Sequence, residues 1–390
     1  MQLIIISVSM FLFVCYAALI LYYRYSWLKI PAFAPKQASP PLVKISVIIP
    51  ARNEEKNITA CLDSICNQTY PASLFEVIVV DDHSTDATAE IVKNYAVQNV
   101  KLISLKEITH EQTFNSYKKK AVEIAIGQST GELIITTDAD CLVNPKWLDI
   151  IASFYLETKA AFIAMPVSYS CNNNFIEIFQ VLDFMTLQGI TGASVYQRIH
   201  SMCNGANIAY SKKAFYQAGG FTGIDNIASG DDVLLMHKIW KQSPEAVYFL
   251  LSKKVIVQTA PMKTVKDFFN QRIRWASKAD KYDDKRIFSV LLFVYLFNVL
   301  LLALPLLAII KNIQLSVFNF QFSILSFWLY LLALKILVEI SFLYPIAKFF
   351  TRQKLLWWFP FAQPFHILYT VIAGWLGKFG SYEWKGRNVK

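Results

Sequence analysis

The chain lacks paired cysteines of the kind that hold zinc or cross-link a small fold. Its six cysteines, spread over 390 residues, include no C-x-x-C pair. That spacing excludes the common zinc and disulfide frameworks and fits a reducing compartment. The sequence also has no helix-turn-helix pattern, basic repeat, internal repeat or low-complexity tract. We therefore expect no nucleic acid among its partners.

Acidic side chains are the minority charge. The chain carries 28 Asp and Glu against 38 Lys and Arg, which gives a formal net charge of +10. This balance suggests an anionic partner, such as a membrane surface or a phosphorylated substrate. Hydrophobic residues make up 55% of the chain, a high share for a soluble protein.

The N-terminal segment contains no charged residue over Leu3–Tyr23, and that length is enough to cross a bilayer. Because no Lys or Arg precedes the apolar run, a cleaved signal peptide is disfavoured. We predict an uncleaved transmembrane anchor over residues 1–24. A basic, proline-rich linker over 25–43 follows, and the positive-inside rule places it in the cytoplasm.

Residues 44–262 alternate between strand-like and helix-like stretches. Such alternation predicts an α/β domain with a mostly parallel sheet and helices on both of its faces. The expected strands are Ile45–Ile49, Val77–Val80, Val100–Ile103, Leu133–Thr136 and Ala161–Val167. The expected helices lie near 54–67, 86–97, 116–127 and 145–157, with a long apolar helix near 174–199.

The C-terminal region, 287–378, is apolar again, with two clear spans over Ile287–Ile310 and Phe322–Ala347. A third stretch, Leu355–Leu376, is interrupted by two prolines, so it either spans the membrane or re-enters it. A basic tail covers 379–390.

Lys335 and Glu339 lie four residues apart within the second span. Each charge is costly at mid-bilayer. They form either a polar patch near the path of a lipid or a mutually neutralising pair packed against another helix.

Two aspartates, Asp138 and Asp140, follow the apolar strand Leu133–Thr136 directly. On an extended chain their carboxylates point the same way and can share a hard cation. Two further pairs lie at element ends, Asp81 with Asp82 and Asp231 with Asp232. Taken singly, each pair has another explanation, as turn residues or as helix N-terminal acids.

The amphipathic segment 263–286 contains the sequence QRIRW. Gln271, Arg274 and Trp275 share one face if the segment is helical. The segment suits an interfacial helix on anionic headgroups, and a guanidinium also suits a diphosphate. The run Lys118–Lys120 could touch donor phosphates through Lys119, or it could form a solvated face.

Six stretches occur in the order found in membrane-bound family 2 glycosyltransferases, and residues 44 to about 280 resemble that family. They read SVIIPARNEE, VIVVDDHSTD, KKKAVEIAIGQSTGELIITTDAD, GANIAYSKKAFYQAGGF, GDD and QRIRW. The resemblance implies a GT-A catalytic domain, which is Rossmann-like, joined to transmembrane helices. It also implies a nucleotide-sugar donor, expected to be a UDP-sugar, and a divalent cation, Mg²⁺ or Mn²⁺.

The resemblance assigns roles to individual residues. The implied donor-binding residues are Pro50, Asn53, Glu54, Asp81, Asp82, Asp138, Gln271, Arg274 and Trp275. Asp140 would ligate the metal together with Asp138. Asp232 matches the catalytic base, and Asp231 stands where many members have Glu, so its role is left open.

The expected function is transfer of one sugar, with inversion, to a lipid or lipid-linked acceptor. The enzyme would be a multi-pass inner-membrane protein with its catalytic domain in the cytoplasm. The alternatives are a processive polysaccharide synthase, a nucleotidyltransferase and an inactive nucleotide-binding scaffold. The sequence leaves the sugar, the acceptor and the oligomeric state open.

Overall fold

The structure is a computed structural model, and its chain divides into two compact units. One, the sheet unit, comprises Ile30–Ser170 and Ser194–Ala260, and the other, the helical unit, comprises Met1–Lys29, Cys171–Ala193 and Pro261–Lys390. The structure describes residues 2–35, 42–95, 99–108, 116–172, 174–199, 202–227, 230–278, 284–311, 314–317, 320–380, 382–384 and 387–389.

Among the described residues, the sheet unit contains a seven-stranded sheet in the order β3-β2-β1-β4-β7-β5-β8. These strands are β1 (Ile45–Ala51), β2 (Phe75–Asp81), β3 (Val100–Ser104), β4 (Leu133–Thr136), β5 (Phe162–Ala164), β7 (Ile208–Ser211) and β8 (Val247–Phe249). The first four are parallel, and β7 is antiparallel to both β4 and β5. The predicted, mostly parallel α/β sheet is therefore confirmed, with one reversed strand that the alternation did not indicate.

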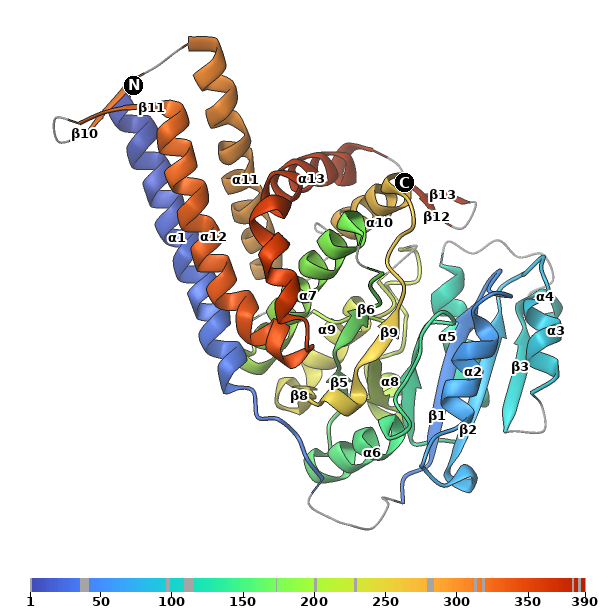
Figure 1. Cartoon of the computed structure of the whole chain (residues 1–390). Coiled ribbons are helices and arrows are strands. Elements are labelled where there is room, and N and C mark those ends of the chain that lie inside the picture. Colours follow the sequence, from blue (N-terminus) through green and yellow to red (C-terminus); the bar gives the residue numbers. More distant parts are fainter. Residues whose placement is uncertain are drawn as a thin grey trace. The chain divides into compact units, whose positions relative to one another are not determined.

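Helices connect these strands, as Figure 1 shows. They are α2 (Ile58–Cys66), α3 (Thr88–Lys93), α4 (Leu105–Ile108), α5 (Tyr117–Gln128), α6 (Trp147–Thr158), α8 (Lys212–Gln217) and α9 (Val233–Gln242), with single 3-10 turns at Ala72–Leu74, Pro244–Ala246 and Lys253–Val255. A second, two-stranded parallel sheet pairs β6 (Val167–Tyr169) with β9 (Val257–Thr259).

The central strands are apolar because both of their faces are covered. Every residue of β4 is buried, and its start pairs with β1 through Ile45 and Leu133. Entry into β4 requires a glycine, since a Cβ on Gly131 would lie 2.5 Å from the backbone nitrogen of Ser46. The Gly131 N–H also donates to Ser46 Oγ at 2.9 Å. This close approach fixes where β4 begins beside β1.

The strand order reverses direction between β1 and β4. Chain order runs outward from β1 through β2 to β3 on one side, while β4 lies on the other side of β1. Ligands bind beyond the carboxyl ends of parallel strands at such a switch point. The segments leaving β1, β2 and β4 carry Asn53, Asp82 and Asp138, so the fold gathers them at one sheet edge.

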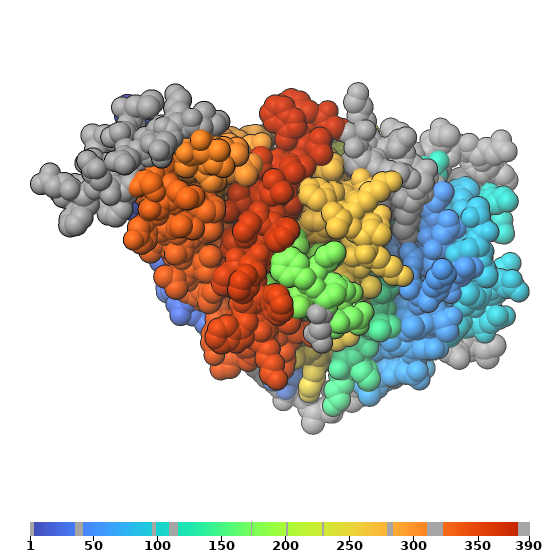
Figure 2. Space-filling model, turned by 45° about the horizontal axis from the view of Figure 1, so that its top comes forward, coloured from blue at the N-terminus to red at the C-terminus, as the bar shows by residue number. Residues whose placement is uncertain are grey.

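The helical unit is built from long apolar helices. They are α1 (Gln2–Lys29), α7 (Phe175–Gln197, whose last residues belong to the sheet unit), α10 (Val265–Ala276), α11 (Lys285–Lys311), α12 (Ile324–Phe349) and α13 (Phe359–Phe379), with a 3-10 segment at Gln353–Trp358 and hairpins β10 (Gln314–Val317)–β11 (Phe320–Ser323) and β12 (Tyr382–Trp384)–β13 (Arg387–Val389). Figure 2 shows α13, in red, beside α12, in orange, and also beside α7 and α10, in green and yellow.

Three helices in the described part of the chain are long and apolar enough to cross a membrane. They cover Ile4–Lys29, Lys285–Ile309 and Ile324–Phe349, in agreement with the three clear predicted segments. The third C-terminal candidate is a helix, α13, with Pro364 inside it, and it is not one of these three. Of the predicted basic tail, Lys385 and Lys390 lie outside the described residues.

The charges inside α12 form a pair. Lys335 Nζ lies 2.8 and 2.9 Å from the two carboxylate oxygens of Glu339 and donates to Gln363 Oε1 at 2.6 Å. Tyr16, from α1, donates a hydrogen bond to the same glutamate. The observed geometry is the mutually neutralising pair, and it connects three helices.

The compact units differ from the contiguous division expected from the sequence. Residues 171–193 of α7 group with the helical unit although they lie inside the expected 44–262 domain. The α7 segment is apolar around most of its circumference and packs against α10 and α13, for instance through Phe179 with Phe268 and Tyr369.

Glu76, on β2, is a buried anion that joins three parts of the sheet unit. It accepts hydrogen bonds from Ser46, Thr130 and Lys101. Burial opposes its ionisation, but these donors outweigh burial and lower the pKa of Glu76 to about 2. The ionised carboxylate therefore stabilises the fold fully above pH 4.5, and this contribution is lost as the pH falls towards 2.

We expect Glu76→Gln to lower the free energy of unfolding by about 1–3 kcal/mol at neutral pH, because it removes a charged acceptor that is hydrogen-bonded by three residues. The loss should shrink at pH 3, where the wild-type carboxylate contributes less. Thermal unfolding of the detergent-solubilised protein at both pH values measures this. Glu132→Gln, at an exposed position, is the control, and an equal loss at both pH values would contradict the assignment.

Candidate active site

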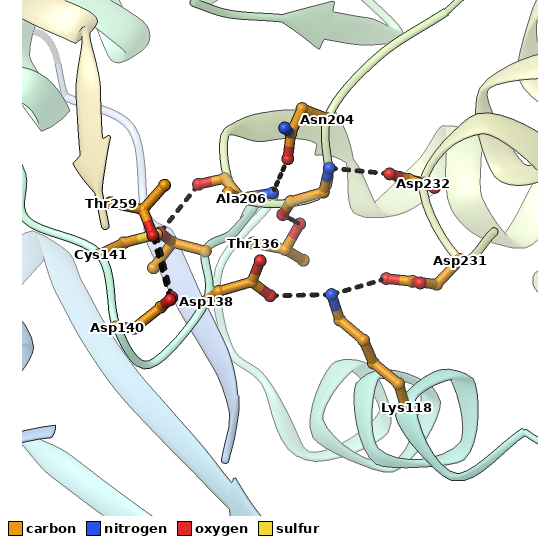
Figure 3. A network of polar contacts seen from close by, with 12 residues as sticks. Lys118, Thr136, Asp138, Asp140, Cys141, Asn204, Ala206, Asp231, Asp232 and Thr259 are labelled. Carbon is orange, nitrogen blue, oxygen red and sulfur yellow. Dashed lines mark hydrogen bonds and ion pairs between the residues drawn. The ribbon is translucent and has the colours of Figure 1, made fainter. Parts of the chain in front are cut away.

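The aspartate pair Asp138 and Asp140 lies in a turn just after β4. The turn closes through a hydrogen bond from Cys141 N to Asp138 O at 3.2 Å, and Leu142 then pairs with Gln258. Thr137 Oγ1 donates to Ala206 O at 2.9 Å and anchors the start of the turn. Both carboxylates therefore leave a fixed backbone at the sheet edge, as Figure 3 shows.

Asp140 is the more constrained of the two carboxylates. Its Oδ2 accepts a hydrogen bond from Thr259 Oγ1 at 3.0 Å. Burial, and then the charges of Asp138 and Glu54, raise the pKa of Asp140 above its ordinary value. Three carboxylates thus share one region of negative potential, and a bound cation would relieve their repulsion.

Two thiols lie close to the same carboxylates. Burial, followed by the charge of Asp140, raises the pKa of Cys61 to about 12 and raises the pKa of Cys141 as well. Both thiols are therefore protonated at physiological pH while no cation is bound. The remaining donors are carboxylate oxygens, which suit Mg²⁺ or Mn²⁺.

The described residues contain no group of three or more His, Cys, Asp or Glu side chains arranged to hold a metal ion. A cation at Asp140 and Asp138 would therefore take its other ligands from a bound molecule or from water, as Mg²⁺ commonly does.

Lys118, at the start of α5, lies between two of the acidic clusters. Its Nζ is 2.8 Å from Asp138 Oδ1 and 3.3 Å from Asp231 Oδ2. Burial lowers the pKa of this lysine, but Asp138 and Asp231 raise it more, so the net shift is upward. Lys118 is therefore a permanent positive charge between the two carboxylates, and Figure 3 shows it reaching between them.

Asp232 is the N-cap of α9, and backbone donors hold both of its oxygens. Oδ1 accepts from Val233 N at 2.8 Å and Oδ2 accepts from Gly205 N at 2.9 Å. Gly230, just before the pair, has a φ of +85°, a backbone conformation that favours glycine. The GDD sequence thus combines a glycine turn, an acid paired with Lys118 and an acid oriented by two amides.

The loop that meets Asp232 is itself held to β4. Thr136 Oγ1 donates to Gly205 O at 3.4 Å, and Asn204 Oδ1 accepts from Ala206 N at 3.0 Å. A Cβ on Gly205 would lie 3.3 Å from Asp232 Oδ2, so a glycine allows the closest approach. These contacts link Asp232 to β4, the strand that Asp138 follows.

The predicted nucleotide-binding residues Asp81, which ends β2, and Asp82, which follows it, are both buried. Asp82 Oδ1 lies 3.0 Å from His83 Nδ1 and 3.7 Å from an Arg52 nitrogen. Asp81 Oδ2 accepts from Ser84 N at 3.4 Å, whereas its buried Oδ1 has no hydrogen-bond partner among the described residues. An unpartnered buried carboxylate oxygen is costly, so a donor on a bound molecule would stabilise it.

The residues after β1 support this region through their hydrogen bonds. Pro50 lies within β1 opposite Val80. Asn53 has a φ of +54°, and its Oδ1 accepts from Thr85 N at 2.8 Å. Glu54 Oε2 accepts from Asn57 Nδ2 at 2.8 Å. The Asn53 side chain therefore holds the loop after β2.

Lys119 differs from its expected placement. It is 2% exposed, and its Nζ donates to the carbonyl oxygens of Ile224 and Ile227 at 2.7 and 2.6 Å. Lys118 is the lysine that reaches the aspartates, because successive residues on a helix point in directions about 100° apart. Lys119 instead holds the loop that leads to Asp231 and Asp232.

Gln271, Arg274 and Trp275 lie on α10 in the helical unit. All three side chains are half-buried, and the one-face arrangement expected for a helix is confirmed. Their predicted contact with the donor stays a prediction. Sequence reasoning named the run Lys118–Lys120 but selected Lys119 rather than Lys118. It missed Thr259, since a strand threonine carries no distinctive pattern.

Comparisons with known proteins identify matching family models and relatives. Residues 46–219 match the sequence model described as "Glycosyl transferase family 2", and residues 133–376 match "Glycosyl transferase family group 2". The chain is similar to glycosyltransferase AglE of Haloferax volcanii, with 27% identity over 64% of this chain and 79% of that protein.

A second relative is the dolichyl N-acetyl-alpha-D-glucosaminyl phosphate 3-beta-D-2,3-diacetamido-2,3-dideoxy-beta-D-glucuronosyltransferase of Methanococcus voltae. It is 25% identical over 67% of this chain and 80% of its own length. Among solved structures, mannosyltransferase PcManGT from Pyrobaculum calidifontis, in complex with GDP-Man and Mn²⁺, superposes with a TM-score of 0.58. That match is 21% identical and covers 94% of this chain and 97% of PcManGT, and it shows a shared fold.

We expect Asp140→Asn to weaken Mn²⁺ binding by roughly tenfold or more, because it removes an anionic oxygen from a site with few protein ligands. Electron paramagnetic resonance of free Mn²⁺, in the presence of a nucleoside diphosphate, measures the affinity. Glu90→Gln, at an exposed position on α3, is the matched loss of one negative charge. Equal Mn²⁺ affinity in Asp140→Asn and the wild type would exclude Asp140 as a ligand.

Proposed function

The chain belongs to glycosyl transferase family 2 and is a glycosyltransferase, and from this premise we propose that it transfers one sugar, with inversion, from a nucleotide-sugar donor to a lipid or lipid-linked acceptor. The observation that carries the proposal is that Lys118 connects the expected metal site with the expected catalytic base. Asp138, beside the expected metal position, and Asp231, beside the expected base, both contact Lys118.

Asp232 is the proposed catalytic base. Its two oxygens are each fixed by one backbone amide, and a carboxylate oxygen can accept more than one hydrogen bond. The carboxylate can therefore receive the proton of an acceptor hydroxyl as that oxygen attacks the anomeric carbon. The carbon–oxygen bond to the donor phosphate breaks in the same displacement, so the anomeric configuration inverts.

The leaving diphosphate carries the charge that must be neutralised. Asp140 and Asp138 would hold a divalent cation, which supplies positive charge to the diphosphate when it is bound. Lys118 contributes a second positive charge from the chain itself. Asp231 holds the Lys118 ammonium in place, which gives this aspartate a role in a position where many family members have Glu.

The nucleotide is proposed to bind beside Asp81 and Asp82. The unpartnered Oδ1 of Asp81 would accept an N–H of the base. A UDP-sugar is the donor that the family resemblance implies, and the imide N–H of uracil would supply this hydrogen bond. GDP-Man, which PcManGT binds, is the competing donor and is an outcome of the experiment below.

Two observations support a lipid acceptor and a membrane location. Three helices of the described chain could cross a membrane, and the name of the Methanococcus relative specifies a dolichyl-phosphate-linked sugar acceptor. Arg24 and Lys29 lie at the end of α1, and Lys348 lies at the end of α12. By the positive-inside rule these helix ends, and the catalytic domain that follows α1, would be cytoplasmic. The membrane that holds the helices would be an inner membrane.

The decisive experiment compares membranes that carry the wild type, Asp232→Asn or Glu90→Gln. Each is incubated with a panel of radiolabelled nucleotide sugars, with Mn²⁺ or a chelator, and the organic-soluble product is separated from polymer. We expect metal-dependent label in the organic phase. In Asp232→Asn, transfer should fall by about 100- to 10,000-fold, while nucleotide binding persists and Glu90→Gln keeps the wild-type rate.

Full turnover in Asp232→Asn would refute its role as the base. Label only in a high-molecular-weight fraction would instead identify a processive polysaccharide synthase. Nucleotide binding without transfer of any sugar in the panel would favour the inactive scaffold.

A further inference from the structure

The five residues of QRIRW on α10 differ in how far they are buried. Arg272 and Ile273 are buried, with exposed fractions of 4% and 7%, whereas Gln271, Arg274 and Trp275 remain half-buried. The two residues between the expected functional positions are therefore the ones that attach the helix to its surroundings. Ile273 packs against Ala373 and its neighbours on α13.

Arg272 is anchored by a buried ion pair within the helical unit. Its NH2 nitrogen donates to Asp183 Oδ2 at 2.7 Å, and both side chains are only 3% exposed. Asp183 lies on α7, which also contacts the segment just before α10 through two hydrogen bonds between Gln180 and the backbone of Met262, at 2.9 and 3.0 Å. The pair is thus part of a fixed α7–α10 contact.

The Arg272 guanidinium also contacts two of the three half-buried residues, Gln271 and Trp275. Its NH1 nitrogen donates to Gln271 Oε1 at 2.8 Å, and its central carbon lies 4.3 Å from the centre of the Trp275 ring. Trp275 also packs against Phe184 on α7, with the two ring centres 6.2 Å apart. Arg272 therefore orients the amide at one functional position and the indole at another.

Asp183 is held in turn from α13. Tyr369 donates a hydrogen bond to Asp183 Oδ1, and His366 Nε2 lies 3.8 Å from the same oxygen. The aspartate thus presents its other oxygen to Arg272 with little freedom to rotate. A buried pair of this kind gives little net stability over an apolar replacement, because desolvation offsets the attraction.

We propose that Asp183 and Arg272 are positioning residues, which hold Gln271 and Trp275 in the orientation required for sugar transfer. This inference rests on the proposed function, because it assumes that those two side chains take part in transfer. The guanidinium is suited to the task, since its plane can donate in one direction and stack in another at the same time. A lysine can replace its charge but cannot reproduce that geometry.

The test uses the full-length protein purified in detergent, with transfer measured per folded molecule. The variants are Arg272→Lys and the apolar pair Asp183→Leu with Arg272→Met, which keeps volume while removing both charges. We expect both to stay monodisperse with a near wild-type melting temperature. We also expect kcat/KM to fall by about 10- to 100-fold, the range expected when reacting groups shift by about 1 Å.

Two comparisons separate positioning from folding. Ser341→Ala removes one hydrogen bond, to the Val338 carbonyl at 2.7 Å, within α12 rather than on α7 or α10, so it should change kcat/KM by less than about threefold. Arg272→Lys in a Trp275→Ala background should cost much less than in the wild type, because its effect passes through the indole and the Gln271 amide.

The proposal is overturned if either folded variant retains wild-type kcat/KM, or if Arg272→Lys costs as much without Trp275 as with it. It is also overturned if the fall in activity matches the loss of folded protein. A wild-type enzyme without Asp232-dependent transfer would refute the proposed function itself. The two failures are therefore distinguishable in one set of assays.

Discussion

The sheet unit gathers carboxylates of like charge in a partly buried site. Their mutual repulsion is the constraint that the other contacts of the site must offset. Burial, and then the nearby charges of Asp138 and Glu54, raise the pKa of Asp140, and repulsion between like charges destabilises a fold unless a cation offsets it. Lys118 supplies part of that compensation from α5. The remainder of the negative potential is what the proposed cation and donor would use.

The helical unit also buries charged side chains, but it pairs them with opposite charges. Its buried charges, Lys335 with Glu339 and Arg272 with Asp183, are paired within 2.9 Å and receive further hydrogen bonds. Each pair connects helices that lie far apart in the sequence. Burying a charge is expensive unless it is paired, so these pairs specify which helices pack together. The sheet unit leaves charge imperfectly compensated at the site where chemistry is proposed.

Much of the fold was predictable because it rests on local pattern. The strands from Ile45, Val100 and Leu133 and the apolar helices follow directly from periodicity and length. The antiparallel β7 was not predictable, since its direction depends on pairing between β4 and β5 rather than on its own residues. The grouping of 171–193 with the helical unit also depends on distant partners on α10 and α13.

The sequence by itself determined the family, the order of the acidic clusters and three helices long enough to cross a membrane, because each is written in residues that are adjacent or regularly spaced. Only the tertiary structure decided that Lys118 rather than Lys119 reaches the aspartates, that Asp231 contacts that lysine, and that Arg272 is held by Asp183. A side-chain contact depends on helix phase and on partners that lie far apart in the sequence, as Lys118 and Asp231 do. Neither is encoded in a local pattern.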